Sequence, residues 1–189
     1  MIQSNAVLDA KGLACPMPIV KTRKAVKGME PGEVIEVQAT DKGSIADLKA
    51  WAESSGHHYL GTIEEDGHLK HYIRKSSEEE KMEQRHPHTV SNEELQAILK
   101  NNNRPVILDV RESVEYAFSH IPGALSIPLG DLETASLKLP KEETLYVVCR
   151  TGNRSDLAAQ KLTEAGFTDV KNVLPGMTAW SGPIEKSIQ

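Results

Sequence analysis

One stretch in the second half of the chain decides how that half folds: Leu145-Tyr146-Val147-Val148-Cys149-Arg150-Thr151-Gly152-Asn153-Arg154-Ser155. Its first residues form an apolar run that predicts a buried strand over 144–149. A short polar loop with a glycine follows, and apolar residues at helical spacing then predict a helix over 154–165. Ligands bind at the carboxyl ends of strands in open α/β sheets, so we expect a functional site where this strand ends.

The loop after Cys149 is suited to hold a negative charge. Its successive backbone N–H groups can form an anion-binding nest, and the following helix adds the positive end of its dipole. Arg150 and Arg154 add two permanent positive charges. This environment favours the thiolate, the reactive form of cysteine, and would also hold a persulfide, Cys149–S–S⁻. We therefore predict a nucleophilic Cys149. The alternative is a small buried cysteine that ends a core strand.

The residues that follow Cys149 are predicted to bind the substrate or the persulfide. Gly152 is expected to supply a positive φ or a close backbone approach. For Thr151, Asn153 and Ser155, ordinary loop and helix-start roles are the alternative. The predicted binding set is Arg150, Thr151, Gly152, Asn153, Arg154 and Ser155.

Short strands alternate with helices in the rest of the second half. The patterning predicts strands over 106–110, 125–129 and 170–174 and helices over 93–100 and 113–119, besides the strand and helix around Cys149. Ser91 and Glu94 form a capping-box pattern at the first of these helices. The almost fully apolar run at 106–110 is typical of a strand covered on both faces of a parallel sheet. These features indicate an open α/β sheet.

Three further polar residues in this half are expected to support loops. Asp109 and Arg111 follow a buried strand, and we expect them to tie loops together because buried polar groups need partners. His120 precedes an Ile-Pro-Gly elbow and is expected to hydrogen-bond loop backbone. A thiolate that a nest stabilises needs no general base, although that role for His120 is the alternative.

Residues 89–189 resemble a single-domain rhodanese. The resemblance rests on the Cys-Arg-x-Gly-x-Arg loop at 149–154 and on three further segments, Tyr116-Ala117-Phe118-Ser119-His120-Ile121-Pro122-Gly123-Ala124-Leu125-Ser126-Ile127, Leu108-Asp109-Val110-Arg111 and Pro175-Gly176-Met177-Thr178-Ala179-Trp180. It implies an open parallel sheet with helices on both faces. It also implies a cysteine that accepts sulfane sulfur from a donor such as thiosulfate and passes it to a thiophilic acceptor.

Phosphatases that share the rhodanese fold are the alternative for this loop. Their arginine stands six positions after the cysteine, whereas Arg154 stands five positions after Cys149. A shorter loop makes a smaller cradle, which suits one sulfur atom better than a tetrahedral phosphate.

The first half of the chain is patterned as β-α-β-α-β-β. We expect strands over 6–10, 33–40, 58–63 and 69–74 and helices over 16–27 and 44–55. Asp66-Gly67 lies between the last two strands and is a signal for a two-residue hairpin turn.

A second cysteine stands before the first predicted helix, in Leu13-Ala14-Cys15-Pro16-Met17-Pro18. Pro16 fits the first helical position, which places Cys15 at or near the N-cap, where the helix dipole lowers a thiol's pKa. Lys11, Lys21 and Arg23 are close in sequence and could support a thiolate. The alternative is an incidental cysteine at a turn.

Residues 5–75 resemble the TusA family of sulfur carriers. The segment Gly12-Leu13-Ala14-Cys15-Pro16-Met17-Pro18 matches the family's Cys-Pro-x-Pro motif, and Thr40-Asp41-Lys42-Gly43-Ser44-Ile45-Ala46-Asp47-Leu48 resembles its second block. The resemblance implies a two-layer βαβαββ sandwich. It implies that Cys15 carries a persulfide, with Pro16 and Pro18 as supporting residues.

Composition and the lack of certain patterns exclude several classes of protein. The 189 residues include 22 Lys and Arg against 27 Asp and Glu, a net charge of −5 that argues against a nucleic-acid binder. We expect no signal peptide at the N-terminus, and no apolar run approaches the ~18 residues of a membrane span. Cys15 and Cys149 are then expected to be free thiols in a reducing cytoplasm. No set of residues has metal-ligand spacing, so neither a metal nor a cofactor is expected.

The sequence therefore predicts two domains with one chemistry. Residues 1–75 form the TusA-like domain, 76–88 a hydrophilic linker with a potential short helix over Ser77–Gln84, and 89–189 the rhodanese domain. We expect a cytoplasmic sulfurtransferase in which Cys149 takes sulfane sulfur from thiosulfate or a low-molecular-weight persulfide. Cys15 then relays it to an acceptor thiol or a sulfur-relay protein. The alternative is a non-catalytic, sulfide- or redox-responsive interaction module that uses the same two cysteines.

Overall fold

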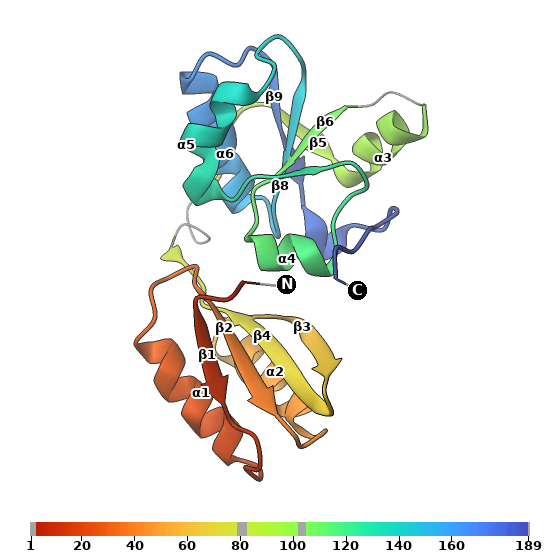
Figure 1. Cartoon of the computed structure of the whole chain (residues 1–189). Helices are drawn as coiled ribbons and strands as arrows, with labels where there is room; N and C mark the ends of the chain where they lie inside the picture. Colours follow the sequence, from red (N-terminus) through yellow and green to blue (C-terminus); the bar gives the residue numbers. More distant parts are fainter. Residues whose placement is uncertain (1–2, 79–82, 102–104, 189) are drawn as a thin grey trace. The chain divides into compact units, whose positions relative to one another are not determined.

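The computed structural model of the chain describes residues 3–78, 83–101 and 105–188. Figure 1 shows the chain, which divides into two compact units, Met1–Glu78 and Glu79–Gln189. The helix predicted over Ser77–Gln84 lies largely outside the described residues. The stretch predicted as a linker includes residues that pack onto the second unit. The backbone N–H groups of Arg85 and His86 each donate to the Asp156 carboxylate at 2.9 Å, and His86 is buried.

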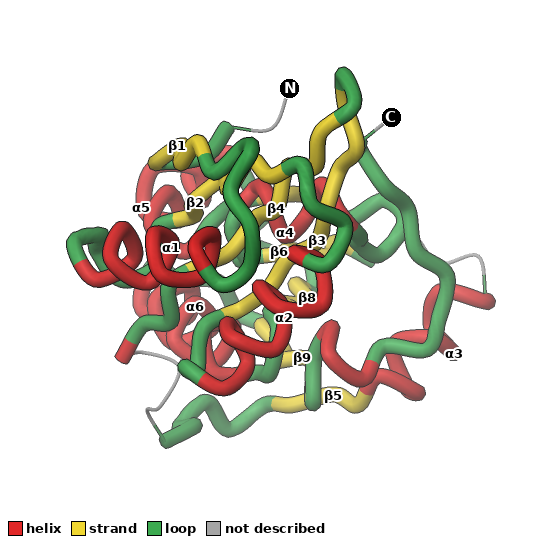
Figure 2. Tube along the Cα trace, turned by 90° about the horizontal axis from the view of Figure 1, so that it is seen from below, coloured by secondary structure: helices red, strands yellow, loops and turns green. Residues whose placement is uncertain are grey.

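The first unit is a four-stranded mixed sheet with two helices on one face, as the sequence predicts. In chain order its elements are β1 (Ala6–Asp9), α1 (Met17–Lys27), β2 (Val34–Ala39), α2 (Ser44–Ser54), β3 (His58–Glu65) and β4 (His68–Arg74). The strand order is β1-β2-β4-β3, with β1 parallel to β2 and the other pairs antiparallel. Figure 2 shows α1 and α2 side by side against the sheet.

One apolar core joins the two layers of this unit. Val26 of α1 and Leu48 of α2 pack against Ile35 and Ile73, which point from β2 and β4 to the same face. The hairpin between β3 and β4 turns at Asp66 and Gly67, with φ values of 51° and 76°. Positive φ at both positions is what a type I′ turn requires, so the predicted Asp-Gly turn is confirmed.

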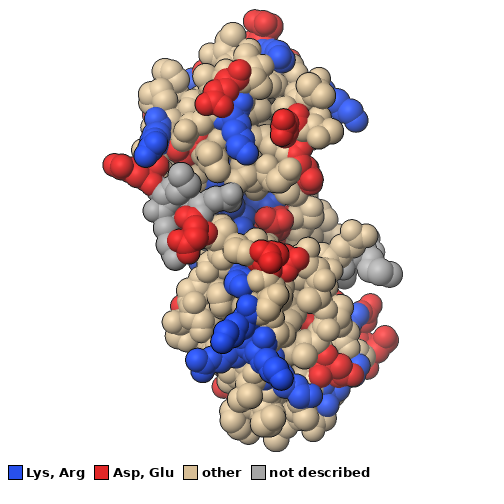
Figure 3. Space-filling view, turned by 90° about the vertical axis from the view of Figure 1, so that its left-hand side faces the viewer, with Lys and Arg blue, Asp and Glu red and all other residues tan. Residues whose placement is uncertain are grey.

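The solvent side of α1 is basic. Lys21, Arg23, Lys24 and Lys27 are all exposed, and Figure 3 shows Lys and Arg side chains gathered over the part of the surface that this helix forms. These cations all lie on α1. The pocket around Cys15 is lined by residues of α1 and also by residues of α2.

The second unit is a five-stranded parallel sheet. Its elements are β5 (Thr89–Ser91), α3 (Asn92–Lys100), β6 (Val106–Asp109), α4 (Ser113–Phe118), β7 (Leu125–Ser126), α5 (Leu132–Ala135), β8 (Leu145–Val148), α6 (Asn153–Glu164) and β9 (Val170–Leu174). The strand order is β5-β9-β8-β6-β7, and every pair is parallel.

Alternate side chains of β8 pack into two separate hydrophobic cores, one on each face of the sheet. Leu145 and Val147 pack with Leu162 of α6 on one face. Tyr146 and Val148 pack with Leu95 of α3 on the other face. The sheet is therefore covered by helices on both faces, which confirms the predicted rhodanese-like architecture and puts the end of β8 at its centre (Figure 1).

The strands β7 and β5 differ from the prediction, and the helix α5 at Leu132–Ala135 was not predicted. The strand expected over 125–129 is paired as a strand only at Leu125–Ser126. The amides of Ile127 and Leu129 still donate to the carbonyls of Asp109, the last residue of β6, and of Val110. A 3-10 turn at Leu129–Asp131 then leads into α5. The short strand β5 was not expected, because its three residues lack a recognisable pattern. Within the described parts of the chain, no helix has the length and apolarity to cross a membrane.

Candidate functional site

Cys149 lies directly after the central strand β8, at the carboxyl edge of the parallel sheet. Its side chain is buried, with 1% exposed. The loop from Cys149 to Gly152 leads into α6, and Gly152 is the N-cap of that helix with a φ of +99°. A left-handed glycine turns the backbone sharply there. The predicted positive φ at Gly152 is thus confirmed.

Two donors point at the sulfur of Cys149. The backbone N–H of Gly152 donates to Sγ over an N–S distance of 3.1 Å, and Ser155 Oγ lies 3.3 Å from Sγ. Both come from the first turn of α6, whose dipole also favours negative charge at this point. The arrangement stabilises a thiolate or a terminal persulfide sulfur.

Asn172, on the neighbouring strand β9, organises both of those donors. Its side-chain oxygen lies 2.6 Å from Ser155 Oγ, and its amide nitrogen donates to the Gly152 carbonyl at 3.0 Å. In the thiol state the Ser155 hydroxyl donates to Asn172 and can accept from the Cys149 S–H; with a thiolate it can turn to donate to Sγ. Asn172 was not among the predicted site residues. The available signal was an uncharged polar residue within the predicted strand 170–174.

Arg154 does not have the role expected of it. Its side chain is 2% exposed and makes a two-pronged ion pair with the buried Glu115, with Nη1–Oε2 at 2.7 Å and Nη2–Oε1 at 2.9 Å. We expected Arg154 to bind the substrate or the persulfide. That expectation is corrected, because Glu115 occupies the guanidinium and the two buried charges offset each other.

Arg150 is placed differently from Arg154. Its side chain is half-buried, and among the described residues the guanidinium has no carboxylate partner. Only its backbone is fixed: the Thr178 N–H and Oγ1 donate to the Arg150 carbonyl at 3.0 and 2.8 Å. Arg150 is therefore the cation of this loop that remains available to an anionic donor.

The segment after β9 lies against the back of the loop. The Met177 N–H donates to the Cys149 carbonyl at 2.9 Å. A Cβ added at Gly176 would lie 2.6 Å from that same carbonyl oxygen and 2.9 Å from that of Arg150, and the φ of Gly176 is +88°. Glycine at 176 is thus needed for two independent reasons, space and backbone conformation.

The other predicted site residues of this unit lie around the loop. Thr151 is exposed, and Asn153 Oδ1 accepts a hydrogen bond of 2.9 Å from Gln84. Asp109 and Arg111 form a buried ion pair with Nη2–Oδ2 at 2.6 Å, and Arg111 also donates to the Ser119 carbonyl at 2.7 Å. These contacts connect the end of β6 to the end of α4.

His120 is fixed in its loop by contacts of its ring and of its backbone. Its Nδ1 lies 2.8 Å from the Tyr116 carbonyl, and its ring stacks on the Tyr116 ring with 3.7 Å between centroids. The backbone groups of His120 and Glu185 exchange hydrogen bonds of 2.9 and 2.8 Å. The geometry is that of a residue that fixes a loop.

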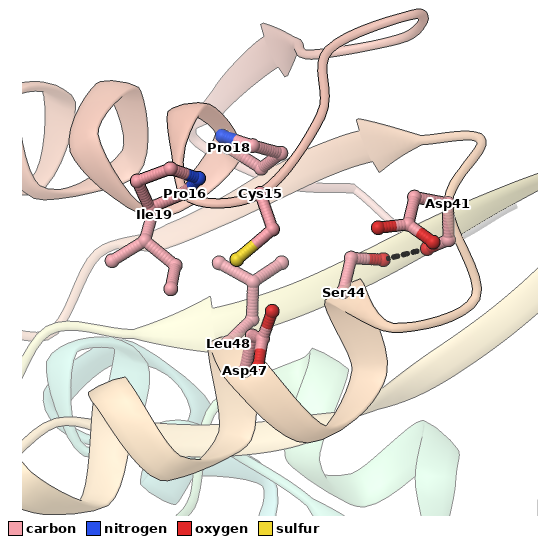
Figure 4. Close-up of a pocket in the computed structure, with 8 residues that line it drawn as sticks. All are labelled: Cys15, Pro16, Pro18, Ile19, Asp41, Ser44, Asp47 and Leu48. Atoms are coloured by element: carbon pink, nitrogen blue, oxygen red, sulfur yellow. Dashed lines mark hydrogen bonds between the residues drawn. The ribbon is translucent and has the colours of Figure 1, made fainter.

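Cys15, in the first unit, occupies an exposed pocket between α1 and α2. Helix α1 begins at Met17 with Pro16 as N-cap, one residue later than expected, so Cys15 precedes the N-cap. Figure 4 shows its Sγ directed toward the side chains of Asp47 and Leu48. The lining residues are Cys15, Pro16, Pro18, Ile19, Asp41, Ser44, Asp47 and Leu48.

The electrostatic environment of Cys15 is opposite to the one expected. A hydrogen bond with the Asp47 carboxylate raises the pKa of the Cys15 thiol, and partial burial and the charges of Asp47 and Asp41 raise it further. The predicted lowering by the helix dipole and nearby lysines is therefore wrong. Lys11 is engaged elsewhere, since its Nζ lies 3.5 Å from Asp9 and donates to Gln38 at 2.8 Å.

A buried hydrogen-bonded chain supports the floor of the Cys15 pocket. Ser44 Oγ lies 2.9 Å from His71 Nε2, and His71 Nδ1 lies 2.8 Å from the Tyr59 hydroxyl and 3.0 Å from Thr62 Oγ1. Burial lowers the pKa of His71 to about 4, so the imidazole is neutral near pH 7. The neutral ring fixes Ser44 at the start of α2, the helix that carries Asp47.

Both halves of the chain match known family models. Residues 6–75 match the family described as "Sulfurtransferase TusA", and residues 91–183 match the "Rhodanese-like domain". The chain is 46% identical over 185 residues to the "Putative sulfur carrier protein YrkF" of Bacillus subtilis, covering 98% of this chain and all of that protein.

Two further comparisons match one half each. The "Putative sulfur carrier protein YrkI" of Bacillus subtilis is 54% identical over 74 residues, covering 39% of this chain and 99% of that protein. A crystal structure of a rhodanese-like domain protein from Staphylococcus aureus aligns with a TM-score of 0.50 and 32% identity, covering 52% of this chain and 97% of that one. The chain therefore belongs to the sulfur carrier and sulfurtransferase family, with a TusA domain followed by a rhodanese-like domain.

Proposed function

We propose that this sulfurtransferase loads sulfane sulfur on Cys149 and relays it as a persulfide through Cys15 to an acceptor thiol. The observation that carries the proposal is the pair of donors on Cys149 Sγ, the Gly152 N–H at 3.1 Å and Ser155 Oγ at 3.3 Å. Both donors lie at the start of α6, where they can stabilise a negatively charged sulfur on Cys149.

The first step uses thiosulfate or a low-molecular-weight persulfide as the donor. The Cys149 thiolate attacks the sulfane sulfur, an S–S bond forms, and sulfite or the donor thiolate leaves with the electron pair of the broken bond. Arg150 is the cation that would steer an anionic donor to the loop. No metal or organic cofactor takes part in this exchange.

The second step moves the outer sulfur to Cys15. The Cys15 thiolate attacks the outer sulfur of the protonated Cys149 persulfide, and the Cys149 thiolate is released. Both cysteines are free thiols, as such chemistry in a reducing cytoplasm requires. Because both cysteines belong to one chain, the proposed transfer is intramolecular and its rate is independent of protein concentration.

Labelled thiosulfate tests the relay directly. The intact chain is loaded with thiosulfate carrying isotopic sulfane sulfur, the donor is removed, and label on each cysteine peptide is followed by mass spectrometry at several dilutions. We expect label on Cys149 first and on Cys15 later, at a rate independent of protein concentration. Cys149→Ser should abolish loading from thiosulfate, whereas Cys15→Ser should leave it intact.

Three outcomes would change the proposal. A transfer rate proportional to protein concentration would place the relay between molecules. Label on Cys149 that never reaches Cys15 would mean that the two domains serve separate partners. If neither cysteine became labelled and no sulfane donor were turned over, the non-catalytic interaction module would be the better hypothesis.

A further inference from the structure

Two carboxylates act on Cys15, and among the residues that the structure describes no cation offsets them. Asp47 lies across the pocket on α2, and Asp41 lies in the loop that precedes that helix (Figure 4). The Cys15 side chain is exposed, and its Sγ points toward the Asp47 side chain (Figure 4). A thiolate formed there would face two like charges instead of the Gly152 N–H and the Ser155 hydroxyl that face Cys149.

The nearby cations are directed elsewhere. Lys11, on the loop before Cys15, is engaged by Asp9 and Gln38, and Lys21 of α1 acts on Asp9. Among the described groups, those whose charges act on the thiol are Asp47 and Asp41. The further cations of the surrounding elements are all exposed. They are Arg23, Lys24 and Lys27 on α1, Lys42 in the turn before α2 and Lys49 on α2. The buried imidazole behind Ser44 is neutral and adds no charge.

We propose that Asp47 is an electrostatic gate on Cys15, which holds the free carrier in the thiol form and admits donors and acceptors that bring positive charge to the pocket. The inference rests on the proposed role of Cys15 as a sulfur carrier and adds a regulation of that site. A small anion such as thiosulfate meets the repulsion of Asp47 and Asp41. A protein partner that presents a lysine, an arginine or a helix N-terminus to Asp47 removes this electrostatic repulsion.

The transfer step then balances without a further reagent. With a cation facing Asp47, the Cys15 thiol releases its proton to water and the thiolate attacks the outer sulfur of a partner persulfide, R–S–SH. A new S–S bond forms on Cys15, the partner's S–S bond breaks, and R–S⁻ leaves and takes up a proton. The sulfane sulfur changes its carrier, and nothing is oxidised or reduced overall.

The first test measures how readily Cys15 ionises. The full chain is alkylated with iodoacetamide, a neutral reagent, between pH 6 and 10.5, and modification of the Cys15 peptide is measured by mass spectrometry. Asp47→Asn should raise the rate at pH 7 about three- to tenfold and shift the profile to lower pH. Glu53→Gln, a carboxylate change farther along the same helix, is the matched control and should leave the profile unchanged.

The second test measures selection by charge. Cys15 exchanges with a disulfide by forming a mixed disulfide and releasing one thiol, and two small disulfides differ mainly in charge: cystamine is cationic and dithiodiglycolate is anionic. The wild-type chain should react faster with cystamine, and Asp47→Asn should reduce that preference at least threefold. A variant whose pocket had merely opened would react faster with both disulfides and keep the ratio.

The outcomes separate this inference from the proposed function. An unchanged profile and an unchanged charge ratio in Asp47→Asn, with an unaltered thermal melting curve, would overturn the gate even if sulfur still reached Cys15. A full gate effect in a chain whose Cys15 never receives sulfur would instead overturn the relay. If Asp47→Asn melted at a lower temperature, Asp47→Glu would decide, because it keeps the charge and should retain the wild-type charge ratio.

Discussion

Arg154 and Glu115 form a buried ion pair that joins the first turn of α6 to α4 across 39 residues of sequence. The two terminal nitrogens of the guanidinium donate to the two carboxylate oxygens, at 2.7 and 2.9 Å, and the side chains are 2% and 3% exposed. Arg154 thus stabilises the fold around the Cys149 loop, whereas Arg150 is available to bind a ligand.

Removal of the Arg154 side chain should destabilise the second unit strongly. Arg154→Ala leaves the Glu115 carboxylate buried without the positive charge that offsets its own, a loss of stability that we expect to be about 3–5 kcal/mol. Thermal and urea unfolding, followed through Trp180 in a Trp51→Phe background, measure it. Arg150→Ala is the matched control: it should keep the melting temperature and weaken the use of thiosulfate more than tenfold in kcat/KM, about 1.4 kcal/mol.

A double replacement tests the mechanism of that loss. With Arg154→Met and Glu115→Leu combined, neither charge of this ion pair is left buried without the other, and most of the stability should return. A double variant as unstable as Arg154→Ala alone would show that the packing of the guanidinium matters and its charge does not.

Gly176→Ala should displace the backbone of the Cys149 loop. The added Cβ would lie 2.6 Å from the Cys149 carbonyl oxygen, and alanine is also strained at a φ of +88°. We expect sulfane-sulfur turnover to fall at least tenfold. Gly123→Ala is the control, since its φ is +77° but nothing lies within 4 Å of the added carbon. It should cost only the strain, about 1–2 kcal/mol, and equal losses of activity in both variants would contradict the steric argument.

Local sequence was sufficient for the architecture around Cys149. The alternating apolar and polar runs and the single glycine after Cys149 predicted the strand, the loop and the helix to within one residue. What local sequence could not assign was the partner of each arginine. Glu115 lies 39 residues from Arg154 and becomes its neighbour only when α4 and α6 pack in the folded sheet.

The Cys15 site shows the same limit more strongly. The Cys-Pro-x-Pro motif located the cysteine, but its pKa was predicted from the nearest residues in sequence, which are basic. The residue that contacts the thiol is Asp47, on the next helix. Electrostatics depends on distance in space, so side chains from elsewhere in the chain overrode the local pattern.

Ser155→Ala should slow the chemistry of Cys149 without unfolding the domain. It removes a donor 3.3 Å from Sγ and leaves the Asn172 side-chain oxygen without its partner. We expect kcat/KM for thiosulfate to fall about three- to thirtyfold, and the pH profile of Cys149 alkylation to move to higher pH. Thr163→Ala, at the far end of α6, is the control and should change neither quantity. A Ser155→Ala enzyme with lower activity but an unmoved alkylation profile would indicate a packing role only.

The first unit should lose stability in mild acid because of His71. Burial lowers the folded-state pKa of this imidazole to about 4 from an ordinary value of 6.5. The unfolded chain therefore binds a proton at a higher pH than the folded chain does, and stability is retained above about pH 6.5. As the pH falls from 6.5 toward 4, protonation of the unfolded state should remove roughly 2–3 kcal/mol.

Urea unfolding of the full chain with Trp180→Phe reports on the first unit through Trp51 and measures this loss. His71→Gln cannot titrate and should flatten the pH dependence, whereas His68→Gln, on the same strand but less buried, should retain it. A histidine titration followed by NMR on the wild-type chain checks the cause independently of any variant. A His71 that titrates near its ordinary value, or a His71→Gln chain with the wild-type slope, would show that the Ser44–His71–Tyr59 chain does not depend on a neutral imidazole.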